Sequence, residues 1–345
     1  MSCNQYLSGV TMLRIAVIGI GFIGNEHLEV WSKMKNIKIA AICGRNEERA
    51  ALLSNLYHCS YYTSSDTLFK KDSFDIVDIC TPTFLHEQDI LLAVQHKTHV
   101  ICEKPITLSL ESMGRILDAV KSSGIKLMVG QVLRFWSEYN LIKKIYDSGK
   151  LGKILSVYAH RLAQYPPDSA WRHTPSQSGG GFFDLHIHDI DYAISLFGEV
   201  ESVYSAGVKS ENDCWDNVST ILKFKNGIFA TTEAVLGITK GYPFSASFRI
   251  VGTDKTLDYT FRGGINIETM KNDARSIVLY DQKNPPIEMF ASGLTAFQAE
   301  LNYFASCVEK DIPVDRISPY EVYYVLKVML AIQESLNSGR LVTID

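Results

Sequence analysis

Three side chains of this sequence have the chemistry needed to move a proton and to hold a charge that develops on oxygen. Asp184 and His188 are four residues apart in a segment with a helical pattern, so we expect them to share one face. Histidine titrates near neutral pH, which makes His188 the natural general base or acid. Asp184 would orient His188, favour its protonated form or bind a neighbouring substrate hydroxyl. Lys104 follows a short apolar segment and could donate to the reacting oxygen.

Each of these groups also has a simpler interpretation. A lysine after a strand is usually a solvated charge, and an aspartate–histidine pair is often a surface or capping pair. The run D-L-H-I-H-D around them also raises a metal hypothesis for Asp184, His186, His188 and Asp189. On a helix His186 would point away from His188, and no H-E-x-x-H pattern is present. We therefore expect no metal.

A glycine-spaced turn gives the clearest indication of a cofactor. The sequence RIAVIGIGFIG contains Gly19, Gly21 and Gly24 in a G-x-G-x-x-G pattern, between an apolar strand and the helical pattern HLEVWSKM. Gly19 would permit the tight turn, Gly21 would let a pyrophosphate approach the backbone, and Gly24 would let the helix pack on the strand. An ordinary strand–helix turn is the alternative. We predict a nucleotide cofactor, with Phe22 and Ile23 among its contacts.

The end of the next apolar run bears on which dinucleotide binds. A carboxylate at this position binds the ribose hydroxyls of NAD, whereas an arginine without a carboxylate tolerates the 2′-phosphate of NADP. The sequence here is Cys43-Gly44-Arg45-Asn46, with no acidic residue. Arg45 could pair with a phosphate, stack on adenine or simply start a helix in solvent. NADP is favoured over NAD, and both remain open.

The elements that would position these residues alternate along the first 130 residues. The runs LRIAVIGI, IKIAAIC, FDIVDIC, HVICEK and IKLMVG read as strands, and helical patterns separate them. This alternation predicts a doubly wound parallel sheet, whose ligands bind at the carboxyl ends of the strands. Those ends are Gly44–Arg45, Thr81–Pro82 and Glu103–Lys104–Pro105.

Composition limits the classes of function. The 345 residues carry a net charge of -4 and 46% hydrophobic residues, which argues against a nucleic-acid surface and suffices for two cores. No apolar run approaches the ~20 residues of a membrane span, and residues 1–12 read as an N-terminal extension rather than a secretion signal. The seven cysteines have no metal-binding spacing, which fits a reducing cytoplasm.

Two combinations of motifs resemble the glucose–fructose oxidoreductase/inositol dehydrogenase (Gfo/Idh/MocA) family. The first runs from Thr81-Pro82 and His86 through Glu103-Lys104-Pro105 to Arg134-Phe135. The second joins Trp171-Arg172 to GGGFFDLHIHDIDYAISLFG. The resemblance implies an α/β Rossmann domain with a doubly wound parallel sheet, which we place at 13–133. It also implies an α+β domain with a large open, mostly antiparallel sheet for substrate binding and oligomerisation, which we place at 134–345.

The second half of the sequence is consistent with that expectation. Strand-like runs dominate after about residue 150, and Asn226-Gly227 between two of them predicts a hairpin. Helical patterns return at 294–309 and 318–338, where Pro319 suits a first turn.

The resemblance also implies roles for individual residues. It assigns catalysis to Lys104, Asp184 and His188, and it implies a cis Lys104–Pro105 bond. The expected cofactor contacts are Gly19, Gly21, Phe22, Ile23, Gly24, Gly44, Arg45, Thr81, Pro82, Leu85, His86, Glu103, Lys104, Pro105, Trp171 and Arg172. The candidate substrate contacts are Arg134, His160, Arg161 and Gln164.

The function predicted is an NAD(P)-dependent oxidoreductase acting on a secondary hydroxyl or ketone of a sugar, cyclitol or related polyol. One alternative is a glycosidase or epimerase-type enzyme of the same fold that keeps and recycles NAD. Another is a non-catalytic, cofactor-sensing regulator, which has no need of all three catalytic groups. By analogy with relatives we expect a cytoplasmic homodimer or homotetramer, with no nucleic-acid or membrane partner.

Overall fold

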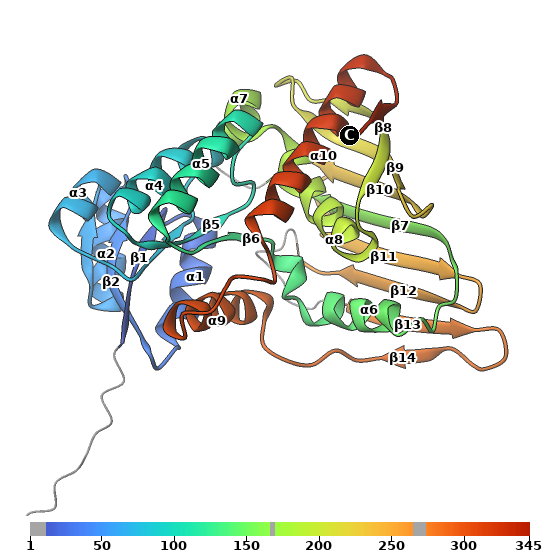
Figure 1. Cartoon of the computed structure of the whole chain (residues 1–345), viewed down its shortest axis with the longest axis horizontal. Coiled ribbons are helices and arrows are strands. Elements are labelled where there is room, and N and C mark those ends of the chain that lie inside the picture. The colour runs from blue at the N-terminus through green and yellow to red at the C-terminus, as the bar shows by residue number, and fades with distance from the viewer. Residues whose placement is uncertain (1–11, 166–169, 265–273) are drawn as a thin grey trace, which may run out of the picture.

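The computed structural model describes residues 12–165, 170–264 and 274–345, and they form two sheets with helices around them (Figure 1). The predicted N-terminal extension, 1–12, lies outside the described residues except for Met12, which directly precedes the first strand. Within the described residues no helix has both the length and the apolar character needed to cross a membrane.

The first sheet is parallel, in the order β3-β2-β1-β4-β5-β6. Its strands are β1 (Leu13–Ile18), β2 (Ile37–Cys43), β3 (Ser60–Tyr62), β4 (Ile76–Ile79), β5 (His99–Glu103) and β6 (Leu127–Gly130). The helices between them are α1 (Phe22–Ser32), α2 (Glu47–Tyr57), α3 (Ser65–Lys71), α4 (Thr83–Gln95) and α5 (Leu110–Ser123). The predicted doubly wound sheet is confirmed.

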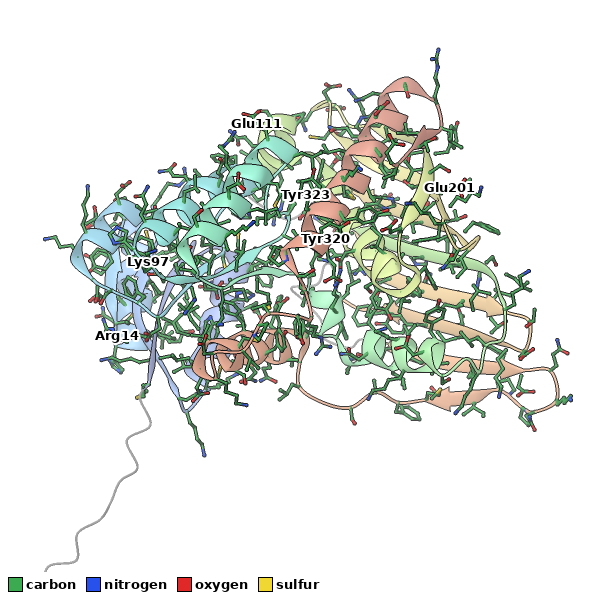
Figure 2. All side chains as sticks on the ribbon, in the orientation of Figure 1. Arg14, Lys97, Glu111, Glu201, Tyr320 and Tyr323 are labelled. Carbon is green, nitrogen blue, oxygen red and sulfur yellow. The ribbon has the colours of Figure 1, made fainter. Side chains whose placement is uncertain are left out.

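Local sequence explains these elements well. The central strands are nearly continuous in apolar residues, and β1 buries Ile15, Ala16 and Val17 completely because helices cover both faces. Helix α5 begins where the Ser109 side chain accepts from the Ser112 amide, and it ends at Gly124 in the left-handed region. Exposed charged side chains such as Lys97 and Glu111 surround this half (Figure 2).

The second sheet has the order β14-β13-β12-β11-β7-β10-β9-β8-β15. Its neighbours are antiparallel except for β7 and β10, so the prediction of a mostly antiparallel sheet is confirmed. The strands are β7 (Ile154–Ala163), β8 (Val200–Lys209), β9 (Trp215–Phe224), β10 (Phe229–Leu236), β11 (Ser245–Gly252), β12 (Lys255–Arg262), β13 (Ala274–Asp281), β14 (Ile287–Met289) and β15 (Val342–Thr343). The hairpin at Asn226-Gly227 joins β9 to β10, with Gly227 at φ 87°.

The remaining helical segments connect the two sheets or cover one face of the second. They are η1 (Val132–Arg134), α6 (Ser137–Asp147), η2 (Ala170–His173), α7 (Pro175–Ser178), η3 (Phe182–His186), α8 (Ile187–Phe197), α9 (Ala296–Glu309) and α10 (Pro319–Ser338). Helix α8 packs on β7 and β10, and α10 packs on β8 and also on α5 of the first half. Helix α9 returns to α1, as Figure 1 shows, so the end of the chain stabilises the first half.

Candidate active site

The glycine turn after β1 has the shape that a dinucleotide requires. Gly19 has φ +96°, and a Cβ there would lie 2.5 Å from the Cys80 carbonyl. A Cβ at Gly24 would lie 1.9 Å from the Gly19 oxygen, so α1 can approach the turn only with glycine at this position. A Cβ at Gly21 would meet no atom within 4 Å, and no side chain caps α1 there. The backbone amides of the first turn are therefore left for an anion.

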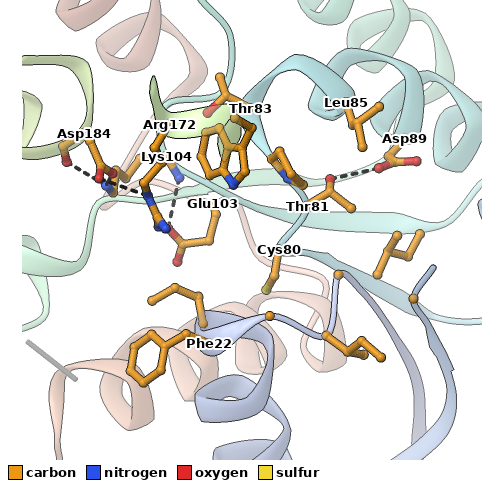
Figure 3. A pocket seen from close by; sticks show the side chains of 18 of the residues that line it. Phe22, Cys80, Thr81, Thr83, Leu85, Asp89, Glu103, Lys104, Arg172 and Asp184 are labelled. Carbon is orange, nitrogen blue, oxygen red and sulfur yellow. Dashed lines mark hydrogen bonds and ion pairs between the residues drawn. The ribbon is translucent and has the colours of Figure 1, made fainter. Parts of the chain in front are cut away.

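A cleft of about 830 Å³ starts at this turn and runs over the carboxyl ends of the strands to the second half of the molecule. Thirteen of the predicted cofactor contacts line it: Gly19, Gly21, Phe22, Ile23, Gly44, Arg45, Thr81, Pro82, Leu85, Glu103, Lys104, Trp171 and Arg172. Figure 3 shows Thr81, Leu85 and Asp89 on one side of this cleft and Lys104, Arg172 and Asp184 on the other.

Three predicted cofactor contacts, Gly24, His86 and Pro105, are not among the residues that line the cleft. Gly24 supports the turn from behind. The His86 ring is buried between two backbone carbonyls, 2.7 Å from the Thr81 oxygen and 2.9 Å from the Pro105 oxygen. It therefore joins the turns after β4 and β5 instead of facing a ligand. The Lys104–Pro105 bond is cis, as expected.

Lys104 and Asp184 meet at the centre of the cleft although 80 residues separate them. The Lys104 Nζ donates to Asp184 Oδ1 at 2.8 Å and to the Asp184 carbonyl at 2.7 Å. Arg172 approaches the other carboxylate oxygen, with Nε 3.3 Å from Oδ2. Burial alone would raise the pKa of Asp184, but the cations Lys104 and Arg172 hold that pKa well below its usual range. Asp184 is thus a fixed carboxylate between two cations.

A short π-helical turn, η3, presents Asp184 and continues into α8, which carries His188. The turn packs closely on β9 and β10. The Gly181 amide donates to Asp216 Oδ1 at 2.7 Å, and a Cβ at Gly181 would lie 2.8 Å from the Leu236 Cβ. The close fit explains the glycine run before Phe182, because a larger residue at Gly181 would move the site.

His188 lines the cleft next to Lys104 and Asp184. Burial lowers the pKa of His188 well below its usual value, and the nearby cations Lys104 and Arg161 lower it further. The ring is therefore neutral at physiological pH and ready to accept a proton. The expectation that Asp184 orients His188 directly has no hydrogen bond to support it: His188 Nδ1 is buried without a partner, and the Asp184 oxygens face Lys104 and Arg172.

His186 is turned away from this centre, as the helical spacing predicted. Its Nε2 lies 2.9 Å from Thr220 Oγ1 and 3.2 Å from Thr232 Oγ1, on the side of β9 and β10. Burial lowers the pKa of His186 to about 3. His186 and His188 therefore do not converge on a common ligand.

The four candidate substrate contacts divide into two pairs. Arg161 and Gln164 line the cleft, whereas Arg134 and His160 do not. Along β7 successive side chains point to opposite faces, so Arg161 faces the cleft while His160 faces away and contacts Ser247 Oγ at 2.8 Å.

Arg134, predicted as a substrate contact, is a buried packing residue outside the cleft lining. Its guanidinium binds both oxygens of Asp191, at 2.7 and 3.0 Å, and Glu321 Oε1 at 2.6 Å. It thereby ties η1 to α8 and α10, and no donor on it faces the cleft. The sequence pattern alone could not distinguish this arginine from Arg161.

Two sequence profiles match the chain in tandem. The profile described as the oxidoreductase family with an NAD-binding Rossmann fold matches residues 13–131, and the GFO/IDH/MocA C-terminal domain matches residues 139–258. An uncharacterized oxidoreductase of Bacillus subtilis is 33% identical over 235 residues, which cover 66% of this chain and 68% of that protein. The chain belongs to the Gfo/Idh/MocA oxidoreductase family.

Other members resemble the chain to a similar degree. The myo-inositol 2-dehydrogenase of Thermotoga maritima is 30% identical over 67% of this chain and 70% of its own length. The 2,7-anhydro-N-acetylneuraminate hydratase of Escherichia coli is 29% identical over 64% of this chain and 61% of its own length. Aldose-aldose oxidoreductase from Caulobacter crescentus superimposes with a TM-score of 0.84 at 20% identity, over 96% of this chain and 100% of that one, and therefore supports the fold alone.

Sequence reasoning missed the far end of the cleft in this Gfo/Idh/MocA protein. Arg49, Ser64, Ser65 and Asp89 line the cleft with Arg45. Asp89 accepts from Ser65 Oγ at 2.8 Å and from Thr81 Oγ1 at 2.9 Å, which fixes the loops around the position expected for the adenosine. One feature of the sequence could have indicated this part of the cleft: Arg45 and Arg49 are four residues apart at the start of a helical pattern.

A buried ionic cluster behind the glycine turn was also missed. His27 on α1 lies 2.9 Å from Asp78 through Nδ1 and 3.5 Å from Glu103 through Nε2, with Glu300 of α9 beside it. Burial would lower the pKa of His27, but these carboxylates raise it to about 9, so the ring is cationic. Burial raises the pKa of Glu300 well above its usual value. The His27 imidazolium is therefore the cation that faces both the Asp78 and the Glu103 carboxylates.

Proposed function

We propose that the protein is an NAD(P)-dependent oxidoreductase that interconverts a secondary hydroxyl and a ketone on a sugar, cyclitol or related polyol. One observation carries this proposal: Lys104 and Asp184 form a 2.8 Å ion pair beside the neutral His188, at the end of a cleft that begins at a dinucleotide-type glycine turn. The family supports the reaction class, and the relatives named as inositol dehydrogenases support a polyol substrate.

Each residue of the catalytic group has one role in this proposal. A bound nicotinamide supplies the hydride acceptor or donor. His188 accepts the hydroxyl proton in the oxidative direction and returns it in the reductive direction. Lys104 donates a hydrogen bond to the reacting oxygen and stabilises its developing negative charge. Asp184 holds the Lys104 ammonium at this position through the contacts to its carboxylate and carbonyl oxygens.

The cofactor contacts favour NADP. The amides at the start of α1 suit the pyrophosphate, and Arg45 and Arg49 line the cleft beyond the end of β2. No carboxylate follows β2 directly, where one would bind the ribose hydroxyls of NAD. We assign the two guanidiniums to the 2′-phosphate of NADP.

An exposed apolar face supports a proposal for the oligomeric state, and the free cysteines support a proposal for the cellular compartment. One face of the second sheet exposes Tyr204, Ile221 and Phe229, and we propose that a second copy covers it in a homodimer or homotetramer. The described cysteines, Cys43, Cys59, Cys80, Cys102, Cys214 and Cys307, are all free thiols, which favours the cytoplasm.

The proposal is tested by nicotinamide reduction across a panel of sugars, cyclitols and polyols, with NAD and NADP in parallel. Wild type should turn over at least one compound, and Lys104→Ala should lower kcat about 100-fold or more while dinucleotide affinity changes less than threefold. Arg45→Ala should raise the KM for NADP about tenfold and leave that for NAD unchanged. Lys97→Ala is the control, since Lys97 is exposed on the first half.

Two outcomes would contradict the proposal. Retained turnover in Lys104→Ala would remove the role given to the lysine. A tightly bound nucleotide with no net reduction of added cofactor would favour the recycling enzyme instead. One relative is named a hydratase and not a dehydrogenase, which makes this alternative specific.

A further inference from the structure

Arg172 contacts Asp184 and lines the same cleft as the glycine turn. It belongs to η2, and Ser178 Oγ donates to its carbonyl at 2.8 Å, which anchors the backbone. The guanidinium carbon lies 4.9 Å from the centre of the Trp171 ring, and Nε lies 3.3 Å from Asp184 Oδ2. A ring face and a carboxylate therefore fix the orientation of this cation.

The two terminal nitrogens of Arg172 have no hydrogen-bond partner within the described part of the chain, although the residue lines the cleft. The side chain is 24% exposed and lines the cleft, while its Nε is buried beside Asp184. An arginine that is held by its stem and its ring contact, and whose terminal N–H groups bond none of the described residues, presents the planar edge that binds a carboxylate through two hydrogen bonds.

The carboxylates around Arg172 are already committed to other groups. Asp184 carries one charge and faces two cations, Lys104 on Oδ1 and Arg172 on Oδ2. Asp189 is bound by Arg161 through both oxygens, at 3.0 and 3.1 Å. Glu103 faces His27. Around Asp184 itself, two cations face one carboxylate.

We propose that Arg172 forms a subsite for the carboxylate of the substrate, so that the substrate is a polyhydroxy acid and not a neutral polyol. This inference rests on the proposed function. Lys104 and Arg172 lie on the two oxygens of one carboxylate, so the reacting hydroxyl and the acid group sit on neighbouring carbons of one small molecule. The secondary alcohol loses a hydride to nicotinamide and a proton to His188 and becomes a ketone, while the acid group is unchanged.

The first test compares matched pairs of acid and neutral compounds: D-gluconate with D-glucitol, and D-galactonate with galactitol. Wild type should show a kcat/KM about 100-fold higher for the acid of at least one pair. Arg172→Gln should reduce that ratio to less than threefold, and Arg172→Lys should retain about a tenfold preference because one ammonium replaces a bidentate contact. Arg340→Gln, at an exposed arginine remote in sequence, is the control.

A structural role for Arg172 alone would lower kcat for acid and neutral compounds equally and leave their ratio unchanged, which would overturn the inference. Equal or better turnover of the neutral member of each pair, or of D-glucose 6-phosphate, would also overturn it. Dinucleotide affinity is measured by fluorescence titration in every variant, and a loss larger than tenfold in Arg172→Gln would return the residue to the cofactor site.

The failure of the proposed reaction can be distinguished from the failure of this inference. If no compound is turned over, D-gluconate and D-glucitol are titrated calorimetrically into wild type saturated with dinucleotide. Tighter binding of D-gluconate that disappears in Arg172→Gln would support the acid subsite without the reaction. Equal binding of both compounds, or binding of neither, would reject the subsite.

Discussion

His188 shows how burial sets the protonation state of a side chain. Its ring is close to Lys104 and Arg161, and neither charge favours a protonated imidazole. A histidine that is neutral at rest can accept a proton from a substrate hydroxyl without first losing one to solvent. The helical spacing in the sequence predicted that His188 and Asp184 lie together, but it gave no information on the cations that set the protonation state.

The oxidative reaction should therefore keep its rate at moderately acidic pH. Since the pKa of His188 is lowered from 6.5, kcat/KM for alcohol oxidation should be constant from pH 8 down through 6.5 and fall only below that pH. In the reductive direction the rate should rise as the pH falls, because His188 must carry the proton. His188→Asn should lower kcat by roughly 100-fold or more. Steady-state rates at fixed ionic strength measure both profiles, and an acidic limb centred above pH 7 would contradict the assignment.

At the scale of elements, α1, β4, β5 and α9 are joined by the cluster around His27. Asp78 of β4 accepts from Trp31 Nε1 at 2.7 Å and contacts His27 Nδ1 at 2.9 Å. Glu300 comes from α9, and the Phe297 ring of that helix lies 5.0 Å from the His27 ring. Helix α1, which follows the glycine turn, is therefore held by the pair of His27 and Asp78. Only the assembled fold creates this pair, since 51 residues separate the two.

This cluster should make stability depend on alkaline pH. The pKa of His27 is raised from 6.5 to about 9, so the native state binds a proton that the unfolded chain releases above pH 6.5. The stabilisation is complete below pH 6.5 and is lost as the pH rises through about 9, by roughly 3 kcal/mol in total. Urea unfolding followed by tryptophan fluorescence from pH 6 to 9.5 measures it.

Two variants separate the His27 effect from general alkaline destabilisation. His27→Gln should be less stable than wild type at pH 6.5, because it leaves Asp78 and Glu103 without a cation. Its free energy of unfolding should change less with pH than that of wild type. His96→Gln, at an exposed histidine, should retain the wild-type slope. An unchanged slope in His27→Gln would show that another group titrates.

In the whole molecule, the candidate active site lies where the two halves meet. Lys104 comes from the turn after β5, whereas Asp184 and His188 come from η3 and α8 over the second sheet. The buried contacts of Arg134 with Asp191 and Glu321 fix this arrangement from behind, and α10 spans both halves. A shift of one half against the other would separate Lys104 from Asp184.

The second sheet has one face under helices and one face with exposed apolar side chains. Strand register places Tyr204 opposite Ile221, and Ile221 opposite Thr231. Tyr204 is 42% exposed and Ile221 is 47% exposed, although both sit in the interior of a sheet. Such a face is typical of a surface that another protein molecule covers.

Charge placed on this face should dissociate the proposed oligomer. Light scattering of wild type should give two or four times the 38.7 kDa of the chain, and Ile221→Glu should give a single chain at micromolar concentration. The helical content should not change, because Ile221 is exposed in the isolated chain. Lys97→Glu, on the first half, should behave as wild type. A wild-type mass of one chain would disprove the oligomer.

Local patterns in the sequence correctly predicted the alternation of strands and helices and the glycine turn, and recognisable motifs pointed to Lys104, Asp184 and His188 as the candidate catalytic group. Short elements such as β3 and the π-helical turn η3 escaped prediction, since three to five residues carry too little periodicity. The surroundings of each arginine depend on long-range contacts that no local sequence pattern contains. Arg134 and Arg161 look alike in sequence, and long-range packing buries both, one against Asp191 and the other against Asp189, but only Arg161 also lines the cleft. The same packing brought Arg172 to Asp184. It also gave His27, His86 and His188 different surroundings. Their electrostatic environments arise from contacts between residues that are distant along the chain.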